Sequence, residues 1–511
     1  MATNIRTPPL VIIGLDAGDP DLIQHWGAEG HLPTITTIMN QGCWGRTSGS
    51  ELINEHAVWV SLFSGLSRGQ HGYYSYRQLK PGTYDLEAVT GLDIDAPPFW
   101  SFLQERDKKV ALIDVPDSAP IRGLAGVQLV NWGSHDSPEH YKLAAEPPEL
   151  LQEVLQCFGP RLPVLEKHDS NAAKDQEIYR RLLHHVEKKG ALCRHLLTRE
   201  RFNLMVVVFA ESHAASHQFW PYRPQAGGAT RAAGDELTHA TRDVYHAIDR
   251  EVGLLLAQLP REANVFVVSS VGMEDDYPTM GLIENFCRQL GYQVPAEFSA
   301  GSSRPIDFAR RIIPESWRIA LSRHFSREKR ERLLADQFRN GTNWRKTTAF
   351  AIPSPYTSFI RVNLQGREPE GIVEPGSAYT AVLDRFEADL KQLIDPQTNE
   401  PAVVRIARTV ELFGCAPHPF LPDLFVEWKP NRFMARVVHP KTELRQRKPD
   451  WYRPSDHSSN GFVAAAGPSI QKRGALGEVE VLDLAPTFLR LTDLPLPEKL
   501  RGKPVATMLR D

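Results

Sequence analysis

A mostly parallel α/β sheet is the fold that the sequence predicts, and two observations carry that prediction. Six short apolar runs, each four to seven residues long, are spread along the chain. Amphipathic stretches, for example 178–197 and 232–259, separate most of these runs. Strands that alternate with helices imply βαβ units and a sheet whose strands are mostly parallel.

Each apolar run has the length and composition of a strand buried on both faces. Most of the runs are rich in β-branched or aromatic residues, which are typical of strands. We therefore expect all six to be buried parallel strands. In chain order they are LVIIGL (10–15), VALIDV (110–115), LMVVVFA (204–210), VFVV (265–268), LFVEW (424–428) and FVAAA (462–466).

Composition excludes several classes of protein. The chain has 511 residues, 59 of them basic and 62 acidic, so its net charge of −3 argues against a dedicated nucleic-acid binder. Its five cysteines are scattered, which disfavours zinc ribbons and disulfide scaffolds. The N-terminus lacks the features of a signal peptide, and no apolar run approaches the length of a membrane span. These features predict a soluble cytoplasmic protein without a membrane partner, whose oligomeric state is not readable.

One basic segment interrupts the alternation of strands and helices. Residues 304–346 contain twelve Lys or Arg against five Asp or Glu. We expect a basic helical insertion over 294–350 within a single domain that covers 1–511. A solvated helical surface is one interpretation of this insertion, and a lid, cap or partner surface is the other.

Polar residues that follow the predicted strands indicate a site at one edge of the sheet. Ligands of open α/β sheets bind beyond the carboxyl ends of the strands. His213 and His217 are four residues apart, so a helix would place both on one face, and His457 precedes the last run. Three histidines suit a metal site, although core or surface histidines also explain the pair. The residues expected at this edge are Asp16, Glu211, His213, His217 and His457.

A second feature is the predicted helix start at Asn54-Glu55-His56. Asn54 is a good N-cap, and the free N–H groups of a helix N-terminus attract anions. The plainer alternative is that Glu55 only compensates the helix dipole, which is worth about 0.3–1 kcal/mol.

Taken in order, these motifs resemble the type I phosphodiesterase / nucleotide pyrophosphatase branch of the alkaline phosphatase superfamily. The opening VIIGLDAGDPDLI resembles the family's first strand and metal-binding Asp, and AVWVSLFSGLSRGQHG resembles its W-T-S-L-x-T-G-x-x-P-x-x-H-G stretch. The segments TSFIRVNLQGREPEGIVEPGSAY, LPDLFVEW and SDHSSNGFVAAAGPSI continue the resemblance over nearly the whole chain. It implies an alkaline phosphatase-like three-layer α/β/α sandwich with a mostly parallel sheet and helical insertions.

The resemblance also implies a ligand set, which this sequence matches only in part. The family uses two metal ions, usually zinc, beside a Thr or Ser nucleophile at a helix N-terminus. Asp16, His217 and His457 match family ligands, whereas His213 stands where the Asp of a D-x-x-x-H motif is expected. In the family's S-D-H-G motif the Asp and His are replaced by Ser270 and Val271, and Glu55 occupies the nucleophile position.

Our first hypothesis is therefore a single-metal enzyme that hydrolyses, transfers or eliminates a group of a small metabolite. His213, His217 and His457 would hold one ion, zinc being favoured, while Fe, Mn or a second metal stays open. Asp16 is a less certain ligand. The catalytic candidates are Glu55, His56 and Glu211, with Glu55 as base or acid. Asn54 and Ser270 are candidates for substrate binding.

Two alternatives remain. The chain could keep the family's phosphodiesterase, phosphatase or sulfatase-type reaction with a different ligand set; Thr47, Ser48, Ser50, Asp275 and Asp276 would be the candidates. It could also be a non-catalytic member that binds a ligand or a partner.

Overall fold

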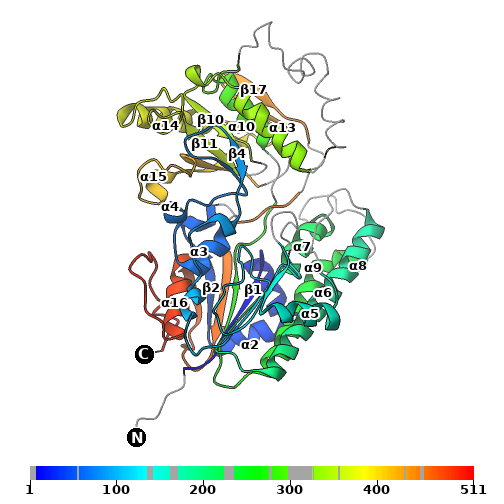
Figure 1. Cartoon of the computed structure of the whole chain (residues 1–511). Helices are drawn as coiled ribbons and strands as arrows, with labels where there is room; N and C mark the ends of the chain where they lie inside the picture. The colour runs from blue at the N-terminus through cyan, green and yellow to red at the C-terminus, as the bar shows by residue number, and fades with distance from the viewer. Residues whose placement is uncertain are drawn as a thin grey trace.

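The chain folds into two lobes, one built on a large sheet and the other on smaller sheets (Figure 1). The computed structural model describes residues 7–53, 57–134, 142–161, 171–223, 235–275, 279–296, 325, 327–354, 357–430, 433–448 and 454–510. The N-terminal and C-terminal parts of the chain both belong to the larger lobe.

The larger lobe is organised around a sheet of nine strands within the described ranges. Most neighbouring pairs are parallel, but β18 runs antiparallel to both of its neighbours and β7 runs antiparallel to β6. In spatial order the strands are β19 (Gly474–Glu480), β2 (Cys43–Ser48), β18 (Gly461–Ala466), β9 (Asn264–Ser269), β1 (Leu10–Leu15), β8 (Leu204–Phe209), β5 (Val110–Ile113), β6 (Gly126–Val130) and β7 (Ala144–Glu146).

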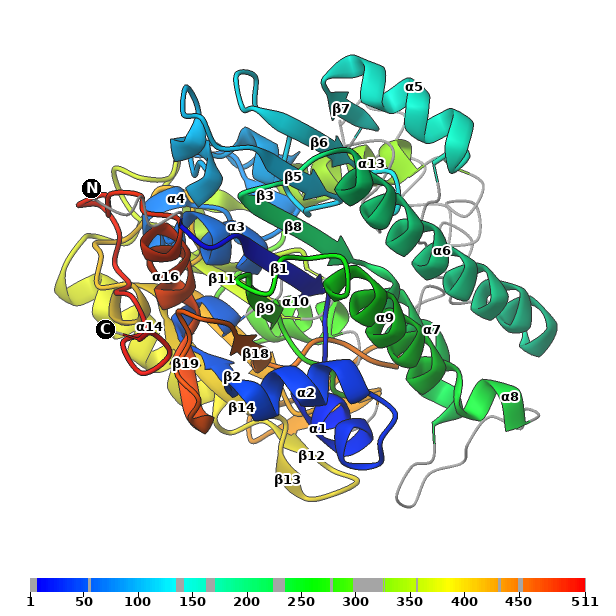
Figure 2. The same cartoon turned by 90° about the horizontal axis from the view of Figure 1, so that it is seen from below.

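Helices cover both faces of this sheet, as Figure 2 shows from below. Alternate side chains of β1 enter two different cores, because successive residues of a strand point to opposite faces. One core contains residues of α2 (Pro33–Gln41), α6 (Ala172–Arg199), α7 (Glu211–Phe219) and α9 (Ala240–Leu256). The other contains residues of α3 (Val58–Ser64) and α16 (Leu484–Leu491). The predicted three-layer α/β/α sandwich is confirmed.

Shorter helices complete the larger lobe. The chain forms α1 (Pro20–Ala28) after the first strand, α4 (Arg68–His71) after α3, α5 (Pro148–Cys157) after β7 and α8 (Asp235–Thr238) before α9. Asp19 caps α1, since its side chain accepts hydrogen bonds from two backbone N–H groups of the first turn.

The described residues of the smaller lobe form two four-stranded sheets, and both are antiparallel. The first has the order β10 (Ala349–Ile352), β11 (Ser358–Val362), β15 (Leu424–Trp428) and β14 (Val403–Arg408). The second has the order β13 (Glu400–Pro401), β12 (Ile394–Asp395), β16 (Arg436–His439) and β17 (Thr442–Arg445). The described helices of this lobe include α10 (Met280–Gln289), α13 (Arg327–Asn340), α14 (Ser377–Leu390) and α15 (Thr409–Leu412).

Two of the six predicted parallel strands are antiparallel. The run at 462–466 belongs to the large sheet as β18 but points the opposite way, and 424–428 is β15 of the smaller lobe. An apolar run of this length shows that a strand is buried but carries no information about its direction or its sheet.

The hairpin of β3 (Arg77–Leu79) and β4 (Leu86–Ala88) joins the lobes. Tyr84, between these two strands, stacks on Trp344 of the smaller lobe with ring centroids 3.7 Å apart. Arg77 binds both carboxylate oxygens of Glu331 on α13 at 2.7 and 2.8 Å. The aromatic core of the smaller lobe therefore includes residues from early in the chain.

The predicted basic insertion at 294–350 lies partly outside the described residues. Its described part contains α13 and the start of β10, and both are built into the smaller lobe. Its function as a lid or cap stays a prediction. No described helix combines the length and hydropathy that crossing a membrane requires.

Candidate metal centre

The parallel strands deliver several polar residues to one edge of the large sheet. Leu15, the last residue of β1, is in register with Phe209 of β8 and with Ser269 of β9. Asp16, Glu211 and Ser270 follow these strand ends within two residues. His457 precedes β18, and because β18 is antiparallel its start lies at this same edge.

Three histidines come together there. Since α7 begins at Glu211, His213 and His217 are separated by about one turn and lie on one face. Their ring centroids are 4.5 Å apart, and the His457 ring lies 5.0 Å from His213 and 4.8 Å from His217. In the described part of the chain, this is the group of His, Cys, Asp or Glu whose ligand atoms all lie within 4.8 Å of one another.

The donor set fits a single divalent ion. The Nε2 atoms of His217 and His457 are 3.1 Å apart. Two nitrogens bound tetrahedrally to zinc at about 2.0–2.1 Å would be separated by about 3.3 Å. Imidazole nitrogen is a ligand that zinc prefers, and three protein ligands are typical of catalytic zinc sites that keep one position open.

A neighbouring hydroxyl orients the ring of His217, whose Nδ1 lies 2.9 Å from Oγ of Ser455. Metal-bound histidines usually use their second nitrogen in this way, which fixes the ring and the tautomer. A carboxylate oxygen of Asp456 lies 3.2 Å from Nδ1 of His457, but the two do not form a hydrogen bond. Sequence reasoning missed Ser455 as a functional residue, although it lies two residues before His457.

Asp16 lies at the same edge but has other partners. Its Oδ1 accepts a hydrogen bond from the indole of Trp59 at 2.8 Å and one from the hydroxyl of Ser270 at 3.3 Å. Asp16 is therefore fixed to the start of α3 and to the end of β9. It is absent from the histidine group defined above for the described residues.

Glu211 is enclosed in a buried charge network. Its side chain is 0% exposed, and its Oε2 lies 3.3 Å from the ammonium of Lys189 on α6. The same ammonium lies 3.2 Å from Asp114 and donates to the backbone carbonyls of Gly133 and Val208. Burial raises the pKa of Glu211, and the nearby Lys189 opposes that rise. This geometry suits a residue that positions α7, and a direct catalytic role of Glu211 stays a prediction.

The residues at the position of the family's second metal differ from the family's ligands, as the sequence predicts. Ser270 donates to Asp16, and Val271 is 2% exposed within the apolar core beside α3. A hydroxyl that is already used as a donor and a valine side chain do not form the Asp–His pair that a second ion would need. The described residues at this place do not fit a second ion.

Carboxylates gather beside the histidines. Glu274 pairs through its backbone with Asp456, next to His457. Burial raises the pKa of Glu274 to about 8, and the nearby carboxylates of Asp456, Glu427 and Asp275 add to the rise. A carboxyl group with a pKa of about 8 is mostly protonated at neutral pH, so Glu274 enters this edge largely as a neutral group.

The other predicted site residues are held by other partners, are buried in a strand or are not described. Asn54, Glu55 and His56 lie outside the described residues, as does Asp276. Asp275 is held by the indole of Trp220 at 2.6 Å and by Arg223 at 2.9 Å. Thr47 is 0% exposed on β2, which makes it unsuitable as a nucleophile without movement of the chain.

Most of the chain matches the model of one protein family. The model of type I phosphodiesterase / nucleotide pyrophosphatase matches residues 10–400. The chain is a member of that family. The resemblance inferred from its motifs is thereby confirmed. The family is one of hydrolytic enzymes, and its match ends before β15, β18 and His457.

Among solved structures, one with a TM-score above 0.5 shows the same fold at low sequence identity. Phosphonoacetate hydrolase from Sinorhizobium meliloti 1021, in complex with phosphonoformate, is 13% identical with a TM-score of 0.52, covering 96% of this chain and 98% of that one. Human ectonucleotide pyrophosphatase / phosphodiesterase 5 is 11% identical with a TM-score of 0.49, covering 98% and 100%. The murine protein of that name is 13% identical with a TM-score of 0.47, covering 96% of each chain. The sequence has no significant match among curated proteins.

Proposed function

We propose that this family member is a metal-dependent enzyme with one divalent ion, zinc being favoured, held by His213, His217 and His457. Its substrate is a small molecule, and its reaction is a hydrolysis, a group transfer or an elimination. The observation that carries the proposal is the convergence of the three imidazoles, all of whose ligand nitrogens lie within 4.8 Å.

The metal ion and the residues of the chain would have different roles in the reaction. A zinc ion at such a site lowers the pKa of a bound water to about 7 or polarises a substrate carbonyl. The hydroxyl of Ser455 holds the ring of His217 in place. Glu55 is the proposed base or acid, on the strength of its position in the family motif alone, and His56 and Asn54 are proposed beside it.

The charge of the site supports a substrate other than a phosphomonoester dianion. Two unit charges 4 Å apart interact by about 4 kcal/mol at an effective dielectric of about 20. The carboxylate of Asp456 lies beside His457, and the position of the family's second metal carries Ser270 and Val271 in place of the Asp and His ligands. The neutralising charge that this family normally provides is thus reduced.

The experiment compares two nitrophenyl probes on the zinc-loaded protein. We expect hydrolysis of nitrophenyl acetate, and we expect His213→Ala to abolish it. His25→Ala is the matched control, because His25 is exposed on α1 and pairs only with Glu29 among the described contacts. We expect no turnover of nitrophenyl phosphate or of its diester.

Either of two results would overturn the proposal. Rapid cleavage of the phosphodiester would restore the family's usual reaction. Acetate hydrolysis that survives His213→Ala would show that the three histidines do not form the reactive centre.

A further inference from the structure

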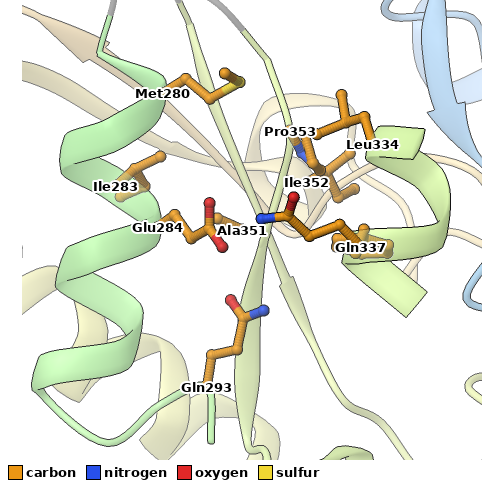
Figure 3. A pocket seen from close by; sticks show the side chains of 10 residues that line it. Met280, Ile283, Glu284, Gln293, Leu334, Gln337, Ala351, Ile352 and Pro353 are labelled. Atoms are coloured by element: carbon orange, nitrogen blue, oxygen red, sulfur yellow. The ribbon is translucent and has the colours of Figure 1, made fainter. Parts of the chain in front are cut away.

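A pocket in the smaller lobe has no part in the site proposed above. It lies between α10, α13 and β10 and is a small, partly open space, whose volume of about 370 Å³ includes solvent beyond its walls. Figure 3 shows its side chains pointing inward from these three elements. Ile283, Leu334 and Ile352 give it apolar walls, one from each element.

The base of the pocket carries a buried acceptor that the described protein leaves unused. Gln293 is 2% exposed, and its Nε2 donates to the hydroxyl of Thr342 at 2.8 Å. Its Oε1 is buried and has no hydrogen-bond partner among the described residues. A buried acceptor without a donor is unfavourable, so a ligand that donates to it removes that cost.

Two further polar groups face each other across the pocket. Figure 3 shows the carboxylate of Glu284 and the amide of Gln337 directed toward the space between α10 and α13. Arg288 donates to one oxygen of Glu284, with its Nε 3.1 Å and its Nη2 2.9 Å away. Beside its apolar walls the pocket thus offers the carboxylate of Glu284, which Arg288 partly neutralises, the amide of Gln337 and the unused Oε1 acceptor of Gln293.

We propose that this pocket is a binding site for a small amine with a branched apolar body. The ammonium would donate to Oε1 of Gln293 and face the carboxylate of Glu284, and the apolar body would lie against Ile283, Leu334 and Ile352. An anion of the same shape would instead meet Glu284 and an unsatisfied amide oxygen. The site goes beyond the proposed function and does not depend on it.

The test is calorimetric titration of the full chain, freed of metal, with isopentylamine and with isovalerate, the anion of similar shape. Metal-free protein is used because an amine could also bind zinc. We expect isopentylamine to bind with a millimolar dissociation constant and isovalerate to bind at least about tenfold more weakly.

Three variants locate the binding. Gln293→Leu removes the acceptor and should weaken amine binding about tenfold or more. Leu334→Trp fills the pocket from the less buried helix α13 and should abolish binding even if Gln293→Leu fails to fold. Gln365→Leu is the control, since Gln365 is exposed and lies outside the pocket, and it should bind as the wild type does.

The proposal is overturned if the wild type gives no heat with millimolar amine, or if isovalerate binds as tightly as isopentylamine. It is equally overturned if Leu334→Trp, with an unchanged melting temperature, still binds the amine.

Discussion

His217 is held at both of its ring nitrogens. Its Nδ1 lies 2.9 Å from the hydroxyl of Ser455 and its Nε2 lies 3.1 Å from Nε2 of His457. One nitrogen is therefore used by a supporting hydroxyl, and the other faces the place where the three imidazoles meet. The contribution of the Ser455 hydroxyl to metal binding can therefore be measured by replacing it.

Replacing Ser455 should weaken metal binding without removing a ligand. In Ser455→Ala the His217 ring loses its partner at Nδ1, and loss of such a partner typically costs 10–100-fold in metal affinity. We expect about tenfold weaker zinc binding in competition with a chromophoric chelator. Ser459→Ala is the control, because Ser459 donates to Glu427 rather than to a histidine. Equal affinities in both variants would contradict the supporting role of Ser455.

The grouping of the three histidines could be predicted from sequence, and some of the residues that support them could not. The spacing of His213 and His217 directly after a buried strand indicates one helical face at the edge of a sheet. His457 was assigned through the motif that precedes the last strand. Lys189 carries no comparable signal, because it lies in the middle of a long helix far from Glu211 in sequence, and only the packing of α6 brings the two together.

At the scale of single elements, α6 fixes the start of α7. Lys189 of α6 is fully buried between Asp114, after β5, and Glu211, at the first turn of α7. Burial lowers the pKa of the Lys189 ammonium, but Glu211 and Asp114 more than offset this, so its pKa lies above the ordinary value. The positive charge of Lys189 thereby offsets the negative charges of two buried carboxylates.

Lys189→Met should destabilise the protein strongly. It leaves two buried carboxylates without a cation, and breaking a buried pair in this way costs about 3–5 kcal/mol. The measurement is urea denaturation at neutral pH, with Lys174→Met as the control at an exposed position near the start of the same helix. A loss below about 1 kcal/mol in Lys189→Met would contradict the importance of this network.

A buried histidine of the same helix, His185, predicts that the protein loses stability in acid. Burial lowers the pKa of His185 to about 3, and the nearby Lys189 adds to this effect. The unfolded histidine binds a proton below about pH 6.5, whereas the folded one does so only near pH 3. The unfolding free energy therefore falls as the pH drops below about 6.5, by about 1.4 kcal/mol per pH unit for this one group.

The measurement is urea denaturation at pH 7.5 and pH 5.5 (roughly one unit either side of the unfolded pKa). We expect His185→Leu to lose less stability between the two pH values than the wild type does, by about 1 kcal/mol. His184→Leu, at an exposed position of the same helix, should behave as the wild type. If His185→Leu showed the same loss as the wild type, the buried neutral state of His185 would be refuted.

The elements themselves were predictable to different degrees. All six apolar runs form strands, because burial on both faces demands uninterrupted apolar residues. The predicted direction of β18 and the predicted sheet of β15 were wrong, because both properties depend on contacts with strands that are distant in the sequence. The strands β2 and β19 were missed because their residues alternate in burial and include Arg46, Glu478 and several glycines.

The whole molecule depends on segments that cross between its lobes. Tyr84 packs on Trp344 and its hydroxyl donates to Asn363 at 2.7 Å, so an early hairpin fills part of the core of the smaller lobe. The two lobes are thereby coupled through side chains that are far apart in the sequence. We expect the free energy of unfolding of the whole chain to fall when this contact is removed.

Tyr84→Ala should lower the free energy of unfolding by about 3 kcal/mol or more, because it removes a buried aromatic ring. Tyr84→Phe keeps the stacked ring and loses only the hydroxyl, and it should cost about 1 kcal/mol. Urea denaturation followed by tryptophan fluorescence measures both. Equal costs for the two variants would show that the stacking on Trp344 contributes little.

Metal content of the full chain tests the central claim most directly. After dialysis against excess zinc and removal of loosely bound ions, mass spectrometry should find one zinc ion per chain. The ion should be absent from His213→Ala and from His457→Ala, and it should be retained by His25→Ala. Two ions per chain, or an ion that persists in both histidine variants, would contradict the three-histidine site.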